Sequence, residues 1–152
     1  GNHVLDDELL TARVAAEGKG MTVCPLSNLK LSHRIKGKRF GHDEELVMTD
    51  LGQHRIKEML AKKLKASVHS DDPAFFDGYM NANYIELARA QDLKQEDIVQ
   101  LAQNAIDTSF LSPEEKAAKT MELADYVTRF NAAERFVKAD TGAAAGQVRR
   151  FG

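Results

Sequence analysis

The chain has 152 residues, enough for one domain with a hydrophobic core of its own. Apolar residues make up 43% of it and charged residues 29%, a composition typical of globular proteins. The formal net charge of −2 leaves no basic excess to neutralise phosphates, so we expect no nucleic-acid partner. We also expect no membrane association, because the sequence lacks a run of about 18 apolar residues.

Cys24 is the single cysteine of the chain. One cysteine excludes a disulfide framework and is typical of a cytoplasmic protein. Its two possible roles are a buried strand residue and a reactive thiol.

The first predicted elements are a helix and a strand. Asp6 is predicted to cap a helix that ends near Gly18 or Gly20. Residues 21–24 favour a short β-strand, which Pro25 ends.

The next third of the chain predicts a strand–helix–strand unit. Residues 29–40 show no clear period and are interpreted as a loop. A helix follows, because apolar residues recur there at helical spacing: Ile56, Met59, Leu60 and Leu64. Residues 66–71 then alternate between apolar and polar as in a strand. Two short strands joined through a helix predict a parallel pair and hence the α/β class.

The last third is predicted to be helical. Residues 98–106 carry an apolar stripe, and Ser112–Glu115 has the pattern of a capping box for a further helix. That helix is expected to end near Val137. The segment 139–152 has little to bury and is predicted to be a disordered tail, which leaves 1–138 as the folded part.

Two adjacent carboxylates, Asp71 and Asp72, end the second predicted strand. Neighbouring side chains on a strand point to opposite sides, so the two acids serve one site only if the backbone turns there. Pro73 favours such a turn by restricting the residue before it. Paired acids at the carboxyl end of a buried strand are typical of active sites in parallel α/β proteins. A solvated turn is the alternative interpretation.

Two motifs in order give the chain a family resemblance. Thr22–Asn28 and, about forty residues later, Ser70–Phe76 resemble the C-terminal part of the zinc-dependent adenosine and adenine deaminases. The similarity covers roughly residues 1–135 and includes further short matches: Gly78-Tyr79, Asn83-Tyr84, 98–106 and Ser109-Phe110.

The resemblance implies a (β/α)8 TIM barrel, which needs about 250 residues. This chain would supply the last two strands, 21–27 and 66–71, with their helices, followed by C-terminal helices. Two strands alone would leave unpaired sheet edges. The remaining N-terminal part of the barrel is therefore an expected partner.

The same resemblance implies a role for each acid. Asp71 corresponds to a zinc ligand, and Asp72 to an acceptor of a hydrogen bond from the purine ring. The implied reaction is hydrolytic removal of the 6-amino group by a water that zinc activates. The sequence around Asp77 is closer to the adenine branch, where Ala-Tyr-Phe-Gly-Gly-Tyr is usual, although Asp77 replaces a glycine. Adenine is therefore the expected substrate, and adenosine is the alternative.

Other residues of the family's zinc site have no counterpart in the sequence. These are the His-x-His of the first strand, a histidine on the fifth, a catalytic glutamate and a histidine ending the sixth. Catalytic zinc needs about three protein ligands and an open position. We therefore expect this chain alone to lack a complete zinc site. The alternative of another class is a non-catalytic interaction module that retains the barrel's terminal motifs.

Three further residues are weaker site candidates. Ser27 and Asn28, at the end of the first predicted strand, are positioned to orient a metal ligand through hydrogen bonds, with turn formation as the alternative. His69 lies two positions before Asp71 and so on the same side of the predicted strand; strand packing is its alternative role. Three aromatic residues are candidates either to close over a flat purine or to join the core: Phe75, Phe76 and Tyr79.

Overall fold

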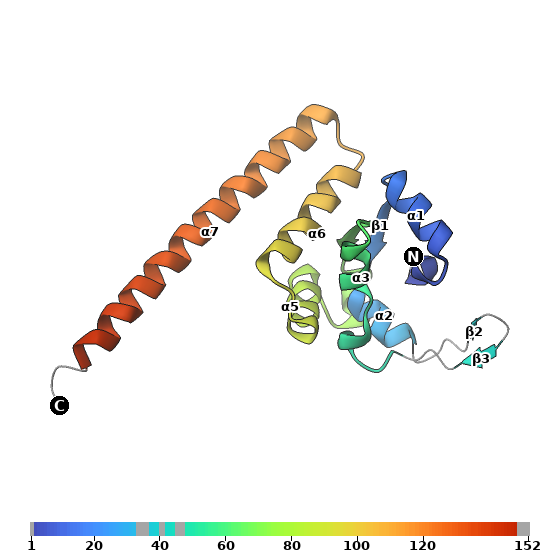
Figure 1. Ribbon diagram of the computed structural model, residues 1–152, viewed down its shortest axis with the longest axis horizontal. Helices are drawn as coiled ribbons and strands as arrows, with labels where there is room; N and C mark the ends of the chain where they lie inside the picture. Colours follow the sequence, from blue (N-terminus) through green and yellow to red (C-terminus); the bar gives the residue numbers. More distant parts are fainter. Residues whose placement is uncertain (1, 33–36, 40–41, 45–47, 149–152) are drawn as a thin grey trace. The chain divides into compact units, whose positions relative to one another are not determined.

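The computed structural model describes residues 2–32, 37–39, 42–44 and 48–148, and for 2, 32, 37–39, 42–44 and 135–148 it describes the backbone alone. The chain divides into two compact units, residues 1–110 and 111–152, and each is considered by itself (Figure 1). The elements in chain order are η1 (Asn2–Asp6), α1 (Glu8–Ala16), β1 (Gly20–Val23), α2 (Pro25–Ser32), β2 (Gly37–Arg39), β3 (His42–Glu44), η2 (Leu51–Gln53), α3 (Ile56–Ala61), β4 (Lys65–Val68), α4 (Pro73–Phe76), α5 (Met80–Gln91), α6 (Gln95–Thr108) and α7 (Pro113–Val148).

The first unit is built on a parallel pair of strands, β1 and β4. Gly20 pairs with Lys65 and Val23 pairs with Val68, so both strands end at the same edge. This confirms the predicted parallel pair. A second pair, β2 with β3, is antiparallel. Residues 29–40 were interpreted as a loop, and this was wrong for 29–32, which lie in α2, and for β2. The rest of that stretch, 33–36 and 40, lies outside the described residues.

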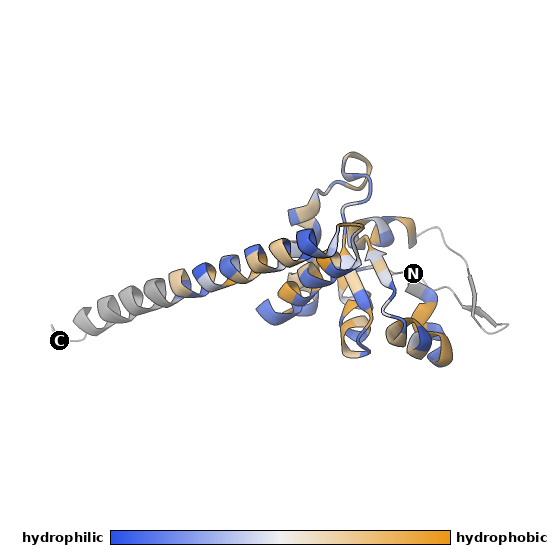
Figure 2. Ribbon diagram, turned by 90° about the horizontal axis from the view of Figure 1, so that it is seen from above, coloured by the Kyte–Doolittle hydropathy of each residue, from blue (hydrophilic) through white to orange (hydrophobic). Residues whose placement is uncertain are grey.

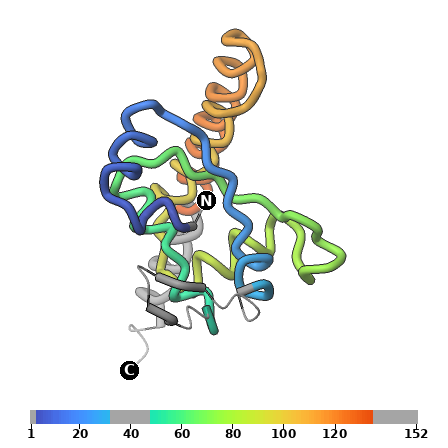
Figure 3. Tube along the Cα trace, turned by 90° about the vertical axis from the view of Figure 1, so that its right-hand side faces the viewer, coloured from blue at the N-terminus to red at the C-terminus, as the bar shows by residue number. Residues whose placement is uncertain are grey.

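The hydrophobic core of the first unit lies on the β1–β4 pair. Its buried members are Val4, Leu5, Val23, Ile56, Met59, Leu64, Ala66, Val68, Leu87 and Leu101. Helix α6 packs closely on the strands: Asn104 Nδ2 donates to the Ala66 carbonyl at 2.8 Å, and a Cβ on Gly20 would lie 2.5 Å from Thr108 Cβ. Figure 3 follows the chain from β1 into α2, and from the green chain after β4 into the loop before α5.

Several element boundaries differ from the predicted ones. The cap of α1 is Asp7, whose side chain accepts from the Leu10 N–H, whereas Asp6 accepts from Arg55 Nη1 at 2.5 Å. Helix α2 begins at Pro25, so Ser27 lies in a helix rather than at the end of a strand. Strand β4 ends at Val68 and not at residue 71.

The second unit is formed by helix α7. Ser112 and Glu115 make the predicted capping box: the Ser112 hydroxyl accepts from the Glu115 N–H at 3.2 Å, and the Glu115 carboxylate accepts from the Ser112 N–H at 2.8 Å. The helix extends to Val148, beyond its predicted end near Val137 and into the predicted tail. Alanine has the highest helix propensity, which favours this extension through Ala143–Ala145.

Hydrophilic and hydrophobic residues alternate along the part of α7 that is coloured in Figure 2. None of the helices, over the residues that the structure describes, is long and apolar enough to cross a membrane.

Candidate functional site

A sharp turn follows β4 and separates the two adjacent acids. Asp71 has φ of 57°, in the left-handed region that residues other than glycine seldom adopt. Asp72 has φ of −97° and occupies the N-cap position of α4, with Pro73 directly after it. The backbone therefore turns at the two carboxylates, as the sequence predicted. The left-handed conformation of an aspartate at this point is consistent with a functional constraint.

Asp71 contacts helix α2, which follows the neighbouring strand. The Ser27 hydroxyl donates to Asp71 Oδ2 at 2.8 Å. Ser27 is buried and lies in the first turn of α2, directly after β1. Parallel strands that end at one edge thus bring together two motifs that are 44 residues apart. The structure places Ser27 where it orients the Asp71 carboxylate.

The Asp72 carboxylate is exposed, and it does not cap α4. Its side chain makes no capping hydrogen bond, although its backbone carbonyl accepts from the N–H groups of Phe75 and Phe76. Aspartate at an N-cap usually satisfies a backbone N–H with its carboxylate. The Asp72 side chain therefore has the freedom to bind something other than its own helix.

His69 and Asn28 have partners away from Asp71. The Oγ of Ser67 lies 2.8 Å from His69 Nε2, and the His69 N–H donates to the Val23 carbonyl. The expectation that His69 shares a strand face with Asp71 was wrong, because β4 ends at Val68 and regular alternation ends with it. Asn28 Nδ2 lies 3.2 Å from His54 Nε2. Asn28 thus contacts His54 rather than the acids.

His54 is a buried histidine that the sequence patterns did not mark as a site residue. Burial lowers its pKa to about 4. Its Nδ1 is buried without a hydrogen-bond partner among the described residues. At neutral pH the ring is therefore uncharged, with Nε2 able to accept from Asn28. No sequence signal distinguishes His54 from the exposed His3.

The Cys24 thiol lies beside Asp71 and is half-buried. Burial and the nearby Asp71 carboxylate raise its pKa, and a backbone hydrogen bond from Asp71 opposes part of that rise. A raised pKa keeps the thiol protonated at neutral pH. Cys24 is accordingly a poor candidate for a thiolate nucleophile or ligand.

The three aromatic candidates divide between the core and the surface. Phe76 is buried and packs edge-on against Phe75, with ring centroids 5.0 Å apart. Phe75 is 68% exposed and Tyr79 is 72% exposed. Phe76 therefore belongs to the core, whereas Phe75 and Tyr79 are available at the surface.

Asp77 ends α4 in the left-handed conformation, with φ of 54° and ψ of 35°. Glycine adopts this conformation without strain, which explains why a glycine suits the position. Aspartate tolerates it better than most residues. Its carboxylate also forms an ion pair with Lys30 of α2. The departure from the usual family sequence thus leaves the turn geometry in place.

The described residues do not by themselves assemble a metal site. No group of three or more His, Cys, Asp or Glu side chains able to hold a metal occurs within the described residues. A carboxylate held by Ser27 suits zinc as one ligand, and further ligands would have to come from elsewhere.

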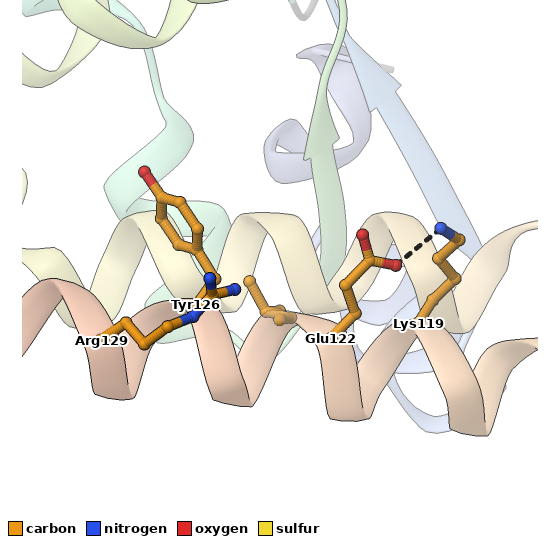
Figure 4. A pocket seen from close by; sticks show the side chains of 5 residues that line it. Lys119, Glu122, Tyr126 and Arg129 are labelled. Carbon is orange, nitrogen blue, oxygen red and sulfur yellow. Dashed lines mark hydrogen bonds and ion pairs between the residues drawn. The ribbon is translucent and has the colours of Figure 1, made fainter.

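A shallow pocket also lies on α7, in the second unit. All the side chains that line it come from this one helix: Lys119, Glu122, Leu123, Tyr126 and Arg129. Figure 4 shows Lys119 paired with Glu122 along the helix, with Tyr126 and Arg129 projecting further on. A depression with a single-helix lining is a helix surface, and we assign it no ligand.

Comparison with known proteins identifies the family. A family model described as adenosine deaminase matches residues 1–128. The chain belongs to the adenosine deaminase family. Adenine deaminase from Sphingopyxis alaskensis is 48% identical over 117 residues, which cover 77% of this chain and 30% of that protein. Adenine deaminase from Rhodospirillum rubrum is 45% identical over 124 residues, which cover 82% and 33%.

One solved structure agrees with this family assignment, and a second shows the same fold. The crystal structure of adenine deaminase from Arthrobacter aurescens matches with a TM-score of 0.70 and 33% identity, over 84% of this chain and 35% of that one. An amidohydrolase from Burkhoderia ambifaria, solved with bound zinc, shares the fold at 23% identity with a TM-score of 0.59, over 84% and 34%. The chain thus spans about a third of the length of the family members that it matches.

Proposed function

We propose that this chain is the C-terminal part of a TIM-barrel aminohydrolase that removes the 6-amino group of adenine. The observation that carries the proposal is the hydrogen bond from Ser27 to Asp71, which joins the two family motifs at the carboxyl edge of β1 and β4. Active sites of TIM barrels lie at that edge. The names of the relatives support adenine as the first substrate to test, with adenosine as the alternative.

In this proposal Asp71 is a zinc ligand that Ser27 holds in orientation, and Asp72 accepts a hydrogen bond from the purine ring. Zinc, when bound, would supply a nucleophile near neutral pH by lowering the pKa of a water. The free Asp72 carboxylate supports its role, because a solvated turn would favour a capping contact. Phe75 and Tyr79 would cover the flat ring. The N-terminal part of the barrel would complete the zinc site, in a cytoplasmic enzyme.

The experiment uses a chimeric deaminase in which this chain replaces the matching stretch of the Sphingopyxis alaskensis enzyme. We expect turnover of adenine at a higher kcat/KM than adenosine. Asp71→Ala should lose zinc and activity together, because a charged ligand is gone. Asp72→Ala should keep its zinc and lose about tenfold to a hundredfold or more in kcat/KM, because a buried ring group is left unpaired.

Asp92→Ala is the matched control. Like Asp71, Asp92 is exposed and left-handed, with φ of 48°, and like Asp72 it is exposed at one end of a helix, here α5. The Asp92 variant shows what the removal of an exposed aspartate outside the candidate site does to zinc content and activity. Small and similar effects of all three substitutions on zinc content and kcat/KM would contradict the proposed roles. A folded, zinc-loaded chimera without turnover of either purine would contradict the proposed function and favour a non-catalytic module.

A further inference from the structure

Asn83 of α5 is fully buried, at 0% exposure, and its amide contacts backbone groups of α2 and of the turn between α4 and α5. The Leu26 N–H donates to Asn83 Oδ1 at 3.1 Å. Asn83 Nδ2 donates to the carbonyls of Gly78 and Tyr79, at 3.2 and 3.1 Å. A buried side chain that is both acceptor and donor in this way fixes the separation of its partners.

The two segments joined by Asn83 are those that carry the candidate site. Leu26 lies in α2 and directly precedes Ser27, whose hydroxyl holds Asp71. Gly78 and Tyr79 end the segment 72–79, which begins at Asp72, contains α4 and is called the Asp72 loop. Asn83 therefore links the chain after β1 to the chain after β4, across 57 residues of sequence.

Two further contacts bring the same two segments together. A Cβ on Gly78 would lie 2.1 Å from Leu26 Cδ1, so the Leu26 side chain occupies space that only glycine leaves open. The ion pair between Lys30 and Asp77 joins α2 to the end of α4. Both contacts can shift at low cost, because the Leu26 contact is made by a methyl group at the end of a flexible side chain and the Lys30–Asp77 ion pair is exposed. The Asn83 amide is the buried member of the set.

We propose that Asn83 is a positioning residue that fixes the Asp72 loop relative to the Ser27–Asp71 pair, an inference that rests on the proposed function. Aspartate at this position would still accept from Leu26 but would have no N–H for Gly78 or Tyr79. It would also place a carboxylate against two carbonyl oxygens. The Asp72 loop would then be free to shift while Asp71 keeps its partner Ser27.

The test compares Asn83→Asp with Asn104→Asp in the chimeric deaminase. Asn104 is a matched control because it is similarly buried, and its amide donates to Ala66 of β4 rather than to the segments that Asn83 joins. We expect Asn83→Asp to raise KM for adenine about tenfold with zinc content unchanged, and Asn104→Asp to leave KM unaltered. A role in folding alone would reduce the active fraction and leave KM constant in both variants.

Hydrogen exchange at the Leu26 N–H gives a readout that does not require activity. Exchange should be faster in Asn83→Ala, which removes the acceptor of this N–H, than in the parent and in Asn83→Asp, which keeps it, and it should be unchanged in Asn104→Asp. Asn83→Ala replaces Asn83→Asp if the latter does not fold, and it should raise KM in the same direction. An unchanged KM, or unchanged exchange at Leu26 in Asn83→Ala, would overturn the inference. If the parent chimera turns over no purine, the proposed function fails. Exchange at Leu26 then still decides whether Asn83 holds the two segments together.

Discussion

His54 shows at the scale of one residue how packing sets a charge state. Its pKa is lowered to about 4 by burial, whereas a histidine in an unfolded chain titrates near 6.5. The unfolded state therefore binds more protons than the folded state between these two values. Stability is fully present above about pH 6.5 and is lost as the pH falls toward 4.

We expect the free energy of unfolding of the chimeric deaminase to decrease between about pH 6.5 and about pH 4, and a neutral residue at His54 to remove part of that decrease. His54 accounts for up to about 3 kcal/mol of this decrease, because its pKa differs by about 2.5 between the folded and unfolded states. Urea unfolding at several pH values measures it for the parent and for His54→Gln. The control is His3→Gln, because the His3 side chain is 77% exposed. Equal pH slopes for the parent and His54→Gln would disprove the expectation.

At the scale of elements, three helices of the first unit are followed by a left-handed residue other than glycine, whereas the left-handed Gly18 follows α1. Lys63 follows α3, Asp77 follows α4 and Asp92 follows α5, and all three residues are left-handed. Residues other than glycine lose stability in this conformation, by about 1–2 kcal/mol in the general case. The ends of these helices carry no sequence signal, since glycine is the usual marker of a C-terminus.

Asp77 allows this cost to be measured. We expect Asp77→Ala to lower the free energy of unfolding of the chimeric deaminase by about 1 kcal/mol relative to Asp77→Gly. Both variants lose the ion pair to Lys30, and alanine alone keeps the left-handed strain. Ala74→Gly is the control. Ala74 lies inside α4, where glycine should be the less stable residue by about 0.5–1 kcal/mol. Finding the same order of alanine and glycine at both positions would refute this account.

At the scale of the whole molecule, the first unit leaves much apolar surface uncovered. Its exposed apolar side chains include Leu9, Leu10, Leu31, Phe75, Tyr79, Met80 and Ile85. Strands β1 and β4 pair with each other, and neither has a second neighbour among the described strands. Open strand edges beside apolar side chains favour association with another chain.

We therefore expect the isolated chain to aggregate or to remain partly folded, to bind zinc weakly and to deaminate neither purine. Supplying the remaining two thirds of the Sphingopyxis alaskensis enzyme should restore a cooperative transition. Size-exclusion chromatography with thermal unfolding, beside an assay at excess zinc, measures all of these properties. A monodisperse monomer with one sharp transition, or turnover above background, is the result that contradicts the prediction.

The sequence by itself determined the features that depend on neighbours along the chain. The capping box of Ser112 and Glu115, the stripe of α6 and the turn at Asp71 follow from local spacing, and the structure contains each of them. The parallel pairing of β1 with β4 also followed, because a helix between short strands leaves few alternatives. The family resemblance added the role of each acid, which stays a prediction.

Only the tertiary structure decided what depends on residues far away in the sequence. Helix α2 was missed because buried polar residues, such as Ser27, interrupt its apolar pattern, and their partners lie on other elements. The low pKa of His54 comes from burial, and the contact of Asn83 with the Leu26 N–H joins segments that meet only when β1 and β4 pair. Local spacing predicts helices and turns, but hydrogen bonds across 44 or 57 residues depend on how those elements pack.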